Sequence, residues 1–351
     1  MATVVDRFRE IILSGHSVED GYLPRLRAAG WTSASGHGPV YGYIDFHFID
    51  GTTNCAGNPN FAGRTTTWTS WDGDFCNLVN PHESWFLHNT SGQRITGNGG
   101  YAMNPTVQGW RDYMANKVAR YFASEFPGLD GIFLDDLWAN KSSTPNCADC
   151  PSDAAWHDGT MQDLQAIRAA MPAGKRLTYN SSPGDTSQAG YAGLADGFMV
   201  EMLGTGWCDG CWESQASIEQ HLSDTDSEVA AGGDVLLVGQ GDSSGSIQQM
   251  RFSHALYLMV AGPHVSYRFG NAGSYQWWDY PEYGWNLGTP LGPRVKPVAT
   301  VFQRTFSNGA ALANMGTSSV TINLGGTYIL PDGSSATSVT LGAHQGVALR
   351  R

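Results

Sequence analysis

The sequence predicts an α/β protein, a (β/α)8 TIM-type barrel followed by a small antiparallel β domain. Short apolar runs alternate with helical patterns as far as residue 269, an order typical of parallel strands joined by crossover helices. The chain of 351 residues has the length of one barrel with an appendage, which favours a barrel over an open sheet. No glycine-rich phosphate loop follows the first strand, and this excludes a dinucleotide-binding sheet.

The predicted barrel strands are residues 8–14, 40–46, 131–135, 176–180, 197–201, 234–240 and 264–269. These seven runs leave a barrel of eight strands one short. We interpret the run 8–14 as the second strand and expect the first to be missing at the N-terminus. In the alternative, a hairpin at residues 85–95, which turns at Ser91 and Gly92, contributes the eighth strand.

Helical spacing of apolar residues predicts helices between these strands, at residues 18–29, 153–170, 214–223 and 246–260. A further helix is expected to begin at Asn104 and Pro105, with Asn104 as the N-cap and Pro105 in the first turn. Its buried stripe includes Trp110 and Tyr113.

The pattern changes near residue 298 to short alternating strands, predicted at 310–315, 319–324, 327–330, 338–341 and 346–349. Gly325-Gly326 and residues 331–333 are turn signals between them. We therefore expect a catalytic barrel of residues 1–297 and a β-sandwich-like domain of residues 298–351. A domain of this size is marginal alone, so we expect it to pack on the barrel.

Composition limits the possible partners. The chain carries 20 basic and 32 acidic residues, and its net charge of -12 argues against nucleic acid and anionic membranes. No apolar run is long enough to span a bilayer, and residues 1–15 lack the layout of a signal peptide. The 44 glycines and 12 tryptophans favour a secreted or cell-surface carbohydrate-active protein whose signal has been removed, with a cytoplasmic protein as the alternative. The sequence carries no signal for an oligomeric state.

The six cysteines permit two kinds of site. We expect three loop disulfides, Cys55–Cys76, Cys147–Cys150 and Cys208–Cys211, in an oxidising compartment. The alternative is a zinc site formed by the four cysteines of the two CxxC pairs.

Residues 129–136 form the central motif, a buried apolar strand that ends in Asp135 and Asp136. Parallel α/β folds place their chemistry at the carboxyl ends of the strands. Because side chains alternate along a strand, Phe133 and Asp135 share one face and Leu134 and Asp136 the other. We therefore expect Asp135 to be catalytic, with Asp136 as the alternative and a loop-capping acid as the structural interpretation.

Glu201 ends its own strand in the same phase, since it follows Met199 as Asp135 follows Phe133. Two such carboxylates facing each other across a barrel mouth could act as nucleophile and general acid/base at a glycosidic bond. A retaining site would hold them about 5–5.5 Å apart and an inverting site about 6.5–9.5 Å. The alternative for Glu201 is an ion pair with a residue such as Arg268.

Other polar and aromatic side chains follow the strand ends and are candidates for binding a sugar. The polar candidates are Asp45, His47, Tyr179, Asn180, Gln240, Asp242, Tyr267 and Arg268. Aromatic faces stack on the C–H faces of sugars, and the loop aromatics are Trp138, Trp207, Trp212, Tyr275, Trp277, Trp278 and Tyr280. For each of these, rim solvation or packing is the alternative. Asp45 and His47 raise the possibility of a metal site, but the sequence has no His/His/acid cluster with close spacing, so we expect no metal and no cofactor.

The run 130–136, Asp-Gly-Ile-Phe-Leu-Asp-Asp, resembles the fourth-strand motif of TIM-barrel glycoside hydrolases of the α-amylase and α-galactosidase superfamilies. The wider chain resembles hypothetical glycosyl hydrolase family 15, at Trp85-Phe-Leu, Met103-Asn-Pro, residues 109–113 and residues 287–292. The resemblance implies Asp135 as nucleophile and Glu201 as acid/base. The missing first strand departs from this pattern, and the acidic doublet leaves the nucleophile open between Asp135 and Asp136.

These observations predict a glycoside hydrolase that cleaves a polysaccharide or oligosaccharide by a retaining mechanism. A non-catalytic carbohydrate-binding barrel and a metal-dependent polysaccharide deacetylase are the alternatives. Loss of turnover with unchanged ligand binding in Asp135→Asn would separate the enzyme from the binding protein. Activity that survives a chelator would exclude the deacetylase.

Overall fold

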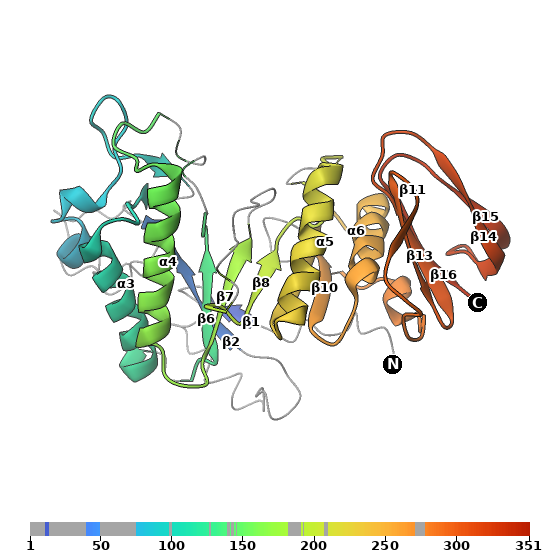
Figure 1. Cartoon of the computed structure of the whole chain (residues 1–351), viewed down its shortest axis with the longest axis horizontal. Helices are drawn as coiled ribbons and strands as arrows, with labels where there is room; N and C mark the ends of the chain where they lie inside the picture. The colour runs from blue at the N-terminus through green and yellow to red at the C-terminus, as the bar shows by residue number, and fades with distance from the viewer. Residues whose placement is uncertain are drawn as a thin grey trace. The chain divides into compact units, whose positions relative to one another are not determined.

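The computed structural model describes residues 11–13, 40–49, 75–97, 100–125, 128–138, 141, 144, 146–181, 191, 193–206, 210–270 and 278–351 (Figure 1). The described chain divides into two compact units, which we call the N-terminal unit, ending at Asp196, and the C-terminal unit, Gly197–Arg351. The predicted helix at 18–29 lies outside the described residues.

Parallel strands form the sheet of the N-terminal unit, in the order β1 (Ile11–Leu13), β2 (Val40–Asp45), β6 (Gly131–Asp135) and β7 (Arg176–Ser181). The register places Asp45 opposite Asp135 and Phe133 opposite Thr178. Strand β6 is buried from Gly131 to Leu134, as expected of a strand covered on both faces.

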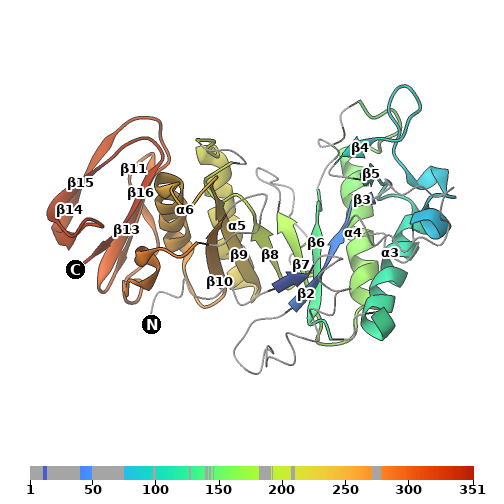
Figure 2. The same cartoon turned by 180° about the vertical axis from the view of Figure 1, so that it is seen from behind.

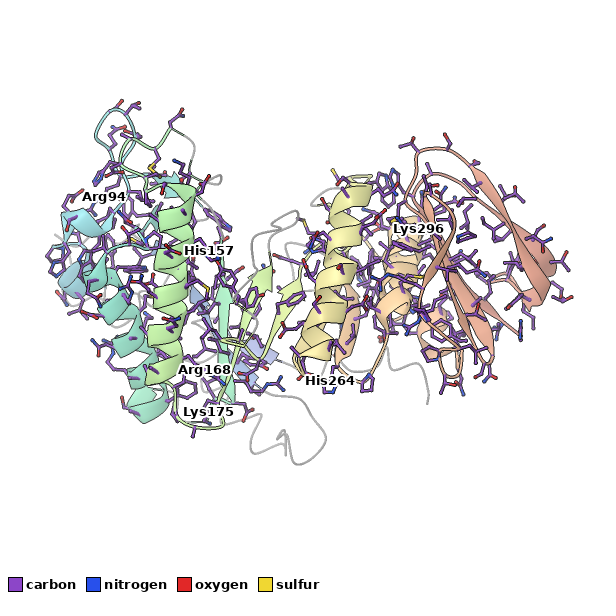
Figure 3. The ribbon with its side chains drawn as sticks, in the orientation of Figure 1. Arg94, His157, Arg168, Lys175, His264 and Lys296 are labelled. Carbon is purple, nitrogen blue, oxygen red and sulfur yellow. A yellow bond between two sulfur atoms is a disulfide. The ribbon has the colours of Figure 1, made fainter. Side chains whose placement is uncertain are left out.

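Two helices of this unit lie side by side, α3 (Gln108–Arg120) and α4 (Asp153–Ala170), as Figures 1 and 2 show from opposite sides. Helix α4 begins where predicted, because the Ser152 side chain accepts a hydrogen bond from the Ala155 amide at 3.2 Å. Near its end Arg168 forms an ion pair of 2.8 Å with Asp196 (Figure 3). The predicted start of α3 is wrong: the Asn104 side chain accepts the amide of Thr106 in a turn, and the helix begins only at Gln108.

A small antiparallel sheet of this unit contains β3 (Phe48–Ile49), β5 (Gly100–Ala102) and β4 (Thr96–Gly97). The predicted hairpin lies beside it, with a bridge between His88 and Arg94 and a turn closed by the Gly92 amide. The hairpin therefore does not supply the eighth barrel strand. Short helical turns complete the unit, Phe75–Val79, Glu83–Trp85 and Tyr121–Glu125.

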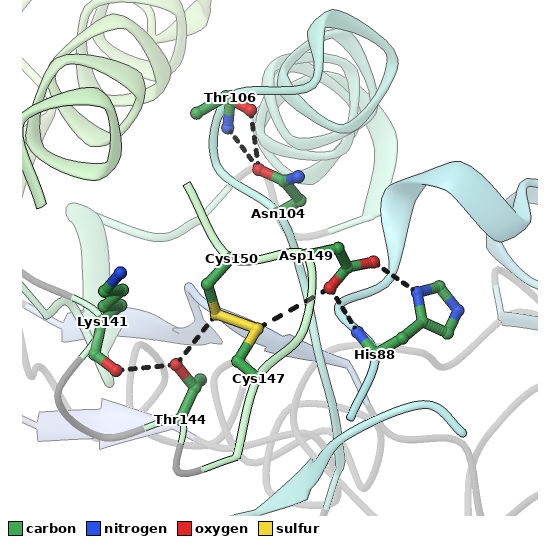
Figure 4. The surroundings of a disulfide bond; sticks show 8 residues. All are labelled: His88, Asn104, Thr106, Lys141, Thr144, Cys147, Asp149 and Cys150. Atoms are coloured by element: carbon green, nitrogen blue, oxygen red, sulfur yellow. Dashed lines mark hydrogen bonds and ion pairs between the residues drawn. A yellow bond between two sulfur atoms is a disulfide. The ribbon is translucent and has the colours of Figure 1, made fainter. Parts of the chain in front are cut away.

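A disulfide joins Cys147 to Cys150, with their Cα atoms 5.5 Å apart (Figure 4). Next to it, Asp149 accepts hydrogen bonds of 2.7 Å from the backbone amide and the Nδ1 of His88. The predicted Cys147–Cys150 bond is confirmed, and the zinc alternative is wrong because these sulfurs are bonded to each other. Cys76 and Cys211 are also in disulfides, while their predicted partners, Cys55 and Cys208, lie outside the described residues.

The C-terminal unit contains the parallel strands β8 (Gly197–Val200), β9 (Asp234–Gln240) and β10 (Val265–Gly270), with helices α5 (Gln215–Ala230) and α6 (Ile247–Val260). Helix α6 packs against β9 and β10 on one side and against an antiparallel sheet on the other (Figures 1 and 2). Every residue of α6 from Gln249 to Val260 is buried except Arg251, because both sides of the helix are covered. A short helical turn follows at Pro281–Gly284.

The antiparallel sheet has the strands β11 (Val295–Val298), β12 (Val301–Phe306), β13 (Gly309–Asn314), β14 (Val320–Ile329), β15 (Ser335–Leu341) and β16 (Gln345–Arg350). Its core lies between the β12-β13-β16 part and the β14-β15 hairpin, with Leu312, Ile322, Val339 and Leu349 buried together. The turn predicted at Gly325-Gly326 is wrong. Strand β14 runs through it with a register shift, and Gly325 takes the left-handed backbone conformation, φ 67°, that a bulge needs.

All seven predicted parallel strands are confirmed, and the chain is an α/β protein with a C-terminal antiparallel sheet. Closure into an eight-stranded barrel stays a prediction, as does the domain boundary at residue 298. Among the described residues, no helix combines the length and apolar character needed to cross a membrane.

Candidate active site

The carboxyl ends of β2, β6 and β7 bring polar side chains together on one face of the N-terminal sheet. Asp45 pairs with Asp135 in register, and Tyr43 pairs with Phe133, so Tyr43, Asp45 and Asp135 point to the same side. Thr178 pairs with Phe133, which puts Asn180 on that side as well. We call Tyr43, Asp45, Asp135 and Asn180 the carboxylate cluster.

Three donors fix the Asp135 side chain. Asn180 Nδ2 and the Asp136 amide donate to its Oδ1 at 2.8 and 2.9 Å, and the Tyr43 hydroxyl donates to its Oδ2. Both carboxylate oxygens are therefore held, and the side chain is partly exposed at the end of a buried strand. A carboxylate held in one orientation at a strand end is suited to reaction with a bound substrate.

Asp136 occupies a different position from Asp135. Its backbone is left-handed, φ 50°, so the chain leaves the strand there. Its carbonyl oxygen lies 2.9 Å from His47 Nδ1. This placement favours Asp135 over Asp136 as the reacting acid.

Asp45 is a buried acid beside two others. Only 5% of it is exposed, and its Oδ1 accepts a hydrogen bond of 3.1 Å from the Phe48 amide. Burial, together with the charges of Asp136 and Asp135, raises the pKa of Asp45 well above its usual value of 3.8. Asp45 therefore keeps its proton to higher pH than an ordinary aspartate and can donate a hydrogen bond when protonated.

Asp45→Asn should become more stabilising as the pH rises. The folded state favours protonated Asp45, so its contribution to the free energy of unfolding is complete below the unfolded pKa near 3.8 and is lost as pH rises through the raised value. Asn cannot ionise and keeps an oxygen for the Phe48 amide. We expect the difference in Tm, variant minus wild type, to increase between pH 4 and pH 8 in thermal melts.

The control for that experiment is Asp158→Asn, which removes a carboxylate with 76% exposure from the same unit. Its Tm difference should stay nearly constant over the same pH range. A Tm difference for Asp45→Asn that is flat or decreases with pH would contradict the proposed electrostatics.

His47 and Tyr179 lie among packing groups. His47 Nε2 is 3.1 Å from Thr160 Oγ1 on α4, and burial lowers the pKa of His47 to about 3, which keeps the ring neutral. Tyr179 faces away from the carboxylate cluster, with its ring centroid 5.7 Å from that of Tyr191, which stacks on His157 of α4 (Figure 3). Because side chains alternate between the two faces of a strand, the sequence alone could have placed Tyr179 and Asn180 on opposite faces of β7. The Trp138 ring is partly exposed and packs on Phe48.

The sequence interpretation missed Tyr43. A tyrosine inside an apolar strand resembles a core residue, although Tyr43 is only partly buried while its strand neighbours Gly42 and Ile44 are buried. Tyr43 stands two residues before Asp45, so the two side chains share one face of β2, and it lies directly opposite Phe133 on β6. This position on the strand is what indicates a functional role. Burial and the neighbouring Asp135 raise the pKa of Tyr43 well above 10, so its hydroxyl remains a donor.

A second group of polar candidates lies in the C-terminal unit. Met199 pairs with Leu236 and Arg268 with Val238, so Met199, Gln240 and Arg268 share one face of this sheet. Glu201 follows Met199 by two residues, immediately after the end of β8. Gln240 is buried and Glu201 is partly exposed.

The remaining candidates of this unit differ in their surroundings. Tyr267 points to the opposite face, where its hydroxyl is 2.6 Å from Ser253 Oγ and its ring stacks on Tyr257, which favours a packing role. Asp242 is exposed, and Trp278 is partly exposed with its ring centroid 5.9 Å from that of Phe269. Trp207 and Trp277 lie outside the described residues.

The described part of the chain contains no group of three or more His, Cys, Asp or Glu side chains arranged to hold a metal ion. The carboxylate cluster itself combines two acids with a phenol and an amide. This set can hold sugar hydroxyls by hydrogen bonds and can present a carboxylate to an electrophilic carbon.

Comparison with known proteins gives one family match. The family described as hypothetical glycosyl hydrolase family 15 matches residues 40–310. No curated protein matches the chain.

Several solved structures resemble the chain. The glycoside hydrolase domain of PelA from Pseudomonas aeruginosa has a TM-score of 0.50 and 14% identity, covering 77% of this chain and 89% of that one. A GH36 α-galactosidase, AgaA from Geobacillus stearothermophilus, has a TM-score of 0.41 and 11% identity, covering 92% of this chain and 46% of that one. The likeness to the PelA domain shows the fold.

Proposed function

This chain belongs to hypothetical glycosyl hydrolase family 15, a family of TIM-barrel glycoside-hydrolase-like proteins, and from that premise we propose that it hydrolyses glycosidic bonds of a polysaccharide or oligosaccharide. We propose a retaining reaction with Asp135 as the nucleophile and Glu201 as the general acid/base. The observation that carries the proposal is the orientation of Asp135 by Tyr43, Asn180 and the Asp136 amide.

The proposed reaction has two steps. Asp135 attacks the anomeric carbon and forms a C–O bond, while the bond to the leaving oxygen breaks and Glu201 gives that oxygen a proton. Glu201 then takes a proton from water, whose oxygen attacks the same carbon and releases Asp135. Glu201 ends the cycle protonated and Asp135 ends it ionised, as both began.

Hydrogen bonds to sugar hydroxyls are the role that we propose for the other polar residues. In the N-terminal unit these are Asp45, whose raised pKa lets it donate, and Asn180. In the C-terminal unit they are Gln240, Asp242 and Arg268. Trp138 and Trp278, which are both partly exposed, are proposed to contact sugar faces.

Tyr43→Phe should lower kcat about tenfold and change KM less, because the variant removes one of the three donors that orient Asp135. Steady-state kinetics on the preferred glycan would measure both constants. Tyr41→Phe is the matched control, since Tyr41 is a buried tyrosine two residues earlier on the same face of β2. Equal losses of kcat in the two variants would indicate general destabilisation of the strand, and Tm values would confirm it.

The test of the function itself is a panel of polysaccharides and oligosaccharides assayed for new reducing ends, with the anomeric configuration of the first product followed by NMR. New reducing ends with retained configuration are expected. Binding without cleavage would support a carbohydrate-binding protein instead. Release of acetate that stops with a chelator would support a deacetylase.

We also propose that the protein acts outside the cytoplasm. The supporting observation is the disulfide between Cys147 and Cys150, a bond that persists in oxidising compartments. Labelling of free thiols in protein taken directly from the native source tests this. Complete alkylation of both cysteines without prior reduction would overturn it.

A further inference from the structure

A cavity of about 670 Å³ opens within the C-terminal unit, where the segment before α5 meets three loops of the antiparallel sheet. The segment contributes Trp212 and Ser214, α5 contributes its first residue Gln215, and the loops contribute Thr300, the 316–318 turn and His344. The volume falls in the range of about 300–1,000 Å³ that is usual for small-molecule sites. The carboxylate cluster contributes no residue to this cavity.

Trp212 is held in place by neighbouring rings. It lies parallel to His344, with 4.9 Å between ring centroids and 7° between ring planes. Phe252 is 5.6 Å from Trp212 and 5.9 Å from His344, so it lies beside the stack rather than on the second face of Trp212. Trp212 is partly exposed and lines the cavity. An indole that is already fixed loses little conformational freedom when a ligand stacks on it.

His344 is fixed by its own backbone. It takes a left-handed conformation, φ 48°, and its amide donates to the Gly316 carbonyl at 3.2 Å. Burial lowers the pKa of His344, which favours its neutral form. The stack therefore offers aromatic surface rather than positive charge.

The lining chemistry selects for an uncharged ligand. None of the described residues that line the cavity is Lys or Arg, the side chains that bind phosphate and carboxylate groups. The single acid, Glu213, is buried and already engaged, with Oε2 accepting from the Gly204 amide at 2.9 Å and Oε1 2.9 Å from His221. Lys296, labelled in Figure 3, is paired with Glu219 at 2.6 Å.

The polar groups around Trp212 are hydroxyls and an amide. Thr317 and Ser318 are exposed at the turn between β13 and β14, and Thr300 adds a third hydroxyl. Ser214 and Gln215 also line the cavity, but Ser214 Oγ accepts from the Ser217 amide at 3.1 Å and Gln215 Nε2 donates to Glu219 at 2.7 Å and to the Ala299 carbonyl at 3.0 Å. Hydroxyls that line the same cavity as an aromatic ring match a sugar ring, which has C–H groups on its face and hydroxyls on its rim.

We infer that this cavity is a second carbohydrate-binding site, which holds a neutral sugar unit of a polysaccharide on the face of Trp212. The choice of a carbohydrate over another neutral ligand rests on the proposed function. The site binds without cleaving, since Glu213 is the one carboxylate among the described residues of its lining and is engaged by its own partners. Its expected contribution is to hold long substrates and to leave short ones unaffected.

Affinity electrophoresis of the full chain tests the inference, with hydroxyethylcellulose, dextran and galactomannan as neutral probes and polygalacturonate as the anionic probe. We expect at least one neutral polymer to retard the protein and polygalacturonate not to do so. Trp212→Ala should raise the polymer concentration for half-maximal retardation at least about threefold. Thr317→Arg, an exposed change at the rim, should do the same without touching the core.

Trp285→Phe is the control, since Trp285 is a partly exposed tryptophan of the same unit that packs on Arg350 outside the cavity. Its retardation should equal that of wild type, and all variants should keep their kcat on a short soluble glycoside. Retardation unchanged in both Trp212→Ala and Thr317→Arg would overturn the inference, as would the lack of retardation by every neutral polymer. If both variants lose retardation but the protein cleaves no glycan, the result would support this binding site and reject the proposed hydrolysis.

Discussion

Asp135→Asn lowers kcat by at least about a thousandfold on the preferred glycan, the scale expected when the attacking group of a covalent mechanism is removed. The amide cannot form the glycosyl ester, yet it fits the space of the carboxylate. Its oxygen can still accept from Asn180 and the Asp136 amide, and its nitrogen can donate to the Tyr43 hydroxyl. Steady-state kinetics should therefore show a collapse of kcat, while calorimetry shows glycan binding within about threefold of wild type.

Asp136→Asn is the matched control, because it makes the same chemical change one residue later. Its side chain leaves from a left-handed turn rather than from the face that carries Phe133 and Asp135. We expect its kcat to stay within about tenfold of wild type. Loss of turnover in Asp136→Asn with activity retained in Asp135→Asn would move the nucleophile by one position. Full turnover in Asp135→Asn would reject the assignment.

Glu201→Gln has the second largest expected effect, a loss of about 10²–10⁴ in kcat on natural glycans, the usual contribution of general acid/base catalysis. Glutamine cannot protonate the departing oxygen. A dinitrophenyl glycoside of the same sugar needs no such proton, so its glycosylation step should be much less affected. Pre-steady-state kinetics should then show a burst of dinitrophenol followed by slow deglycosylation.

Glu219→Gln provides the comparison, since it removes an acid of the same unit whose partner is Lys296. Both substrates should react with it at wild-type rates. Equal losses of Glu201→Gln on natural and activated substrates would contradict an acid/base role. An ion-pair role for Glu201 would instead appear as a lower Tm with kcat preserved.

The central strand could be predicted closely because its evidence is local. A continuous apolar run predicts a parallel strand, and alternation alone puts Asp135 on the side of Phe133. The structure adds the register with β2, which brings Tyr43 and Asp45 to the same side. That pairing joins segments far apart in sequence, so no local pattern in the sequence could identify Tyr43 as a partner of Asp135.

Two further differences between the predicted and the observed elements have specific local causes. Asn104 and Pro105 resemble a helix start, but the Asn104 side chain closes a turn with Thr106 and delays the helix to Gln108. Gly325-Gly326 resembles a hairpin turn, and the same left-handed freedom serves a bulge inside β14 instead. In both cases the residue types predict the local backbone conformation. Tertiary packing decides whether that conformation serves a turn, a helix start or a bulge.

Trp212 shows the limit of sequence interpretation for function. Its position near a strand end predicted a role at the barrel mouth, together with the other loop aromatics. The structure stacks it on His344, from the loop between β15 and β16, and both rings line the cavity in the C-terminal unit. Long-range contacts of this kind define a site that residue types and spacing cannot show.

The most direct test of the account is to react the protein with a 2-deoxy-2-fluoro glycosyl fluoride of the sugar found in the glycan panel and to digest it for mass spectrometry. The fluorine slows release of the covalent intermediate, so a retaining enzyme accumulates as an ester. We predict a single glycosyl adduct on the peptide that contains Asp135, and no adduct in Asp135→Asn. An adduct on a different carboxylate, or complete turnover of natural glycan without any adduct and with inverted product, would contradict the assignment of Asp135 as the nucleophile.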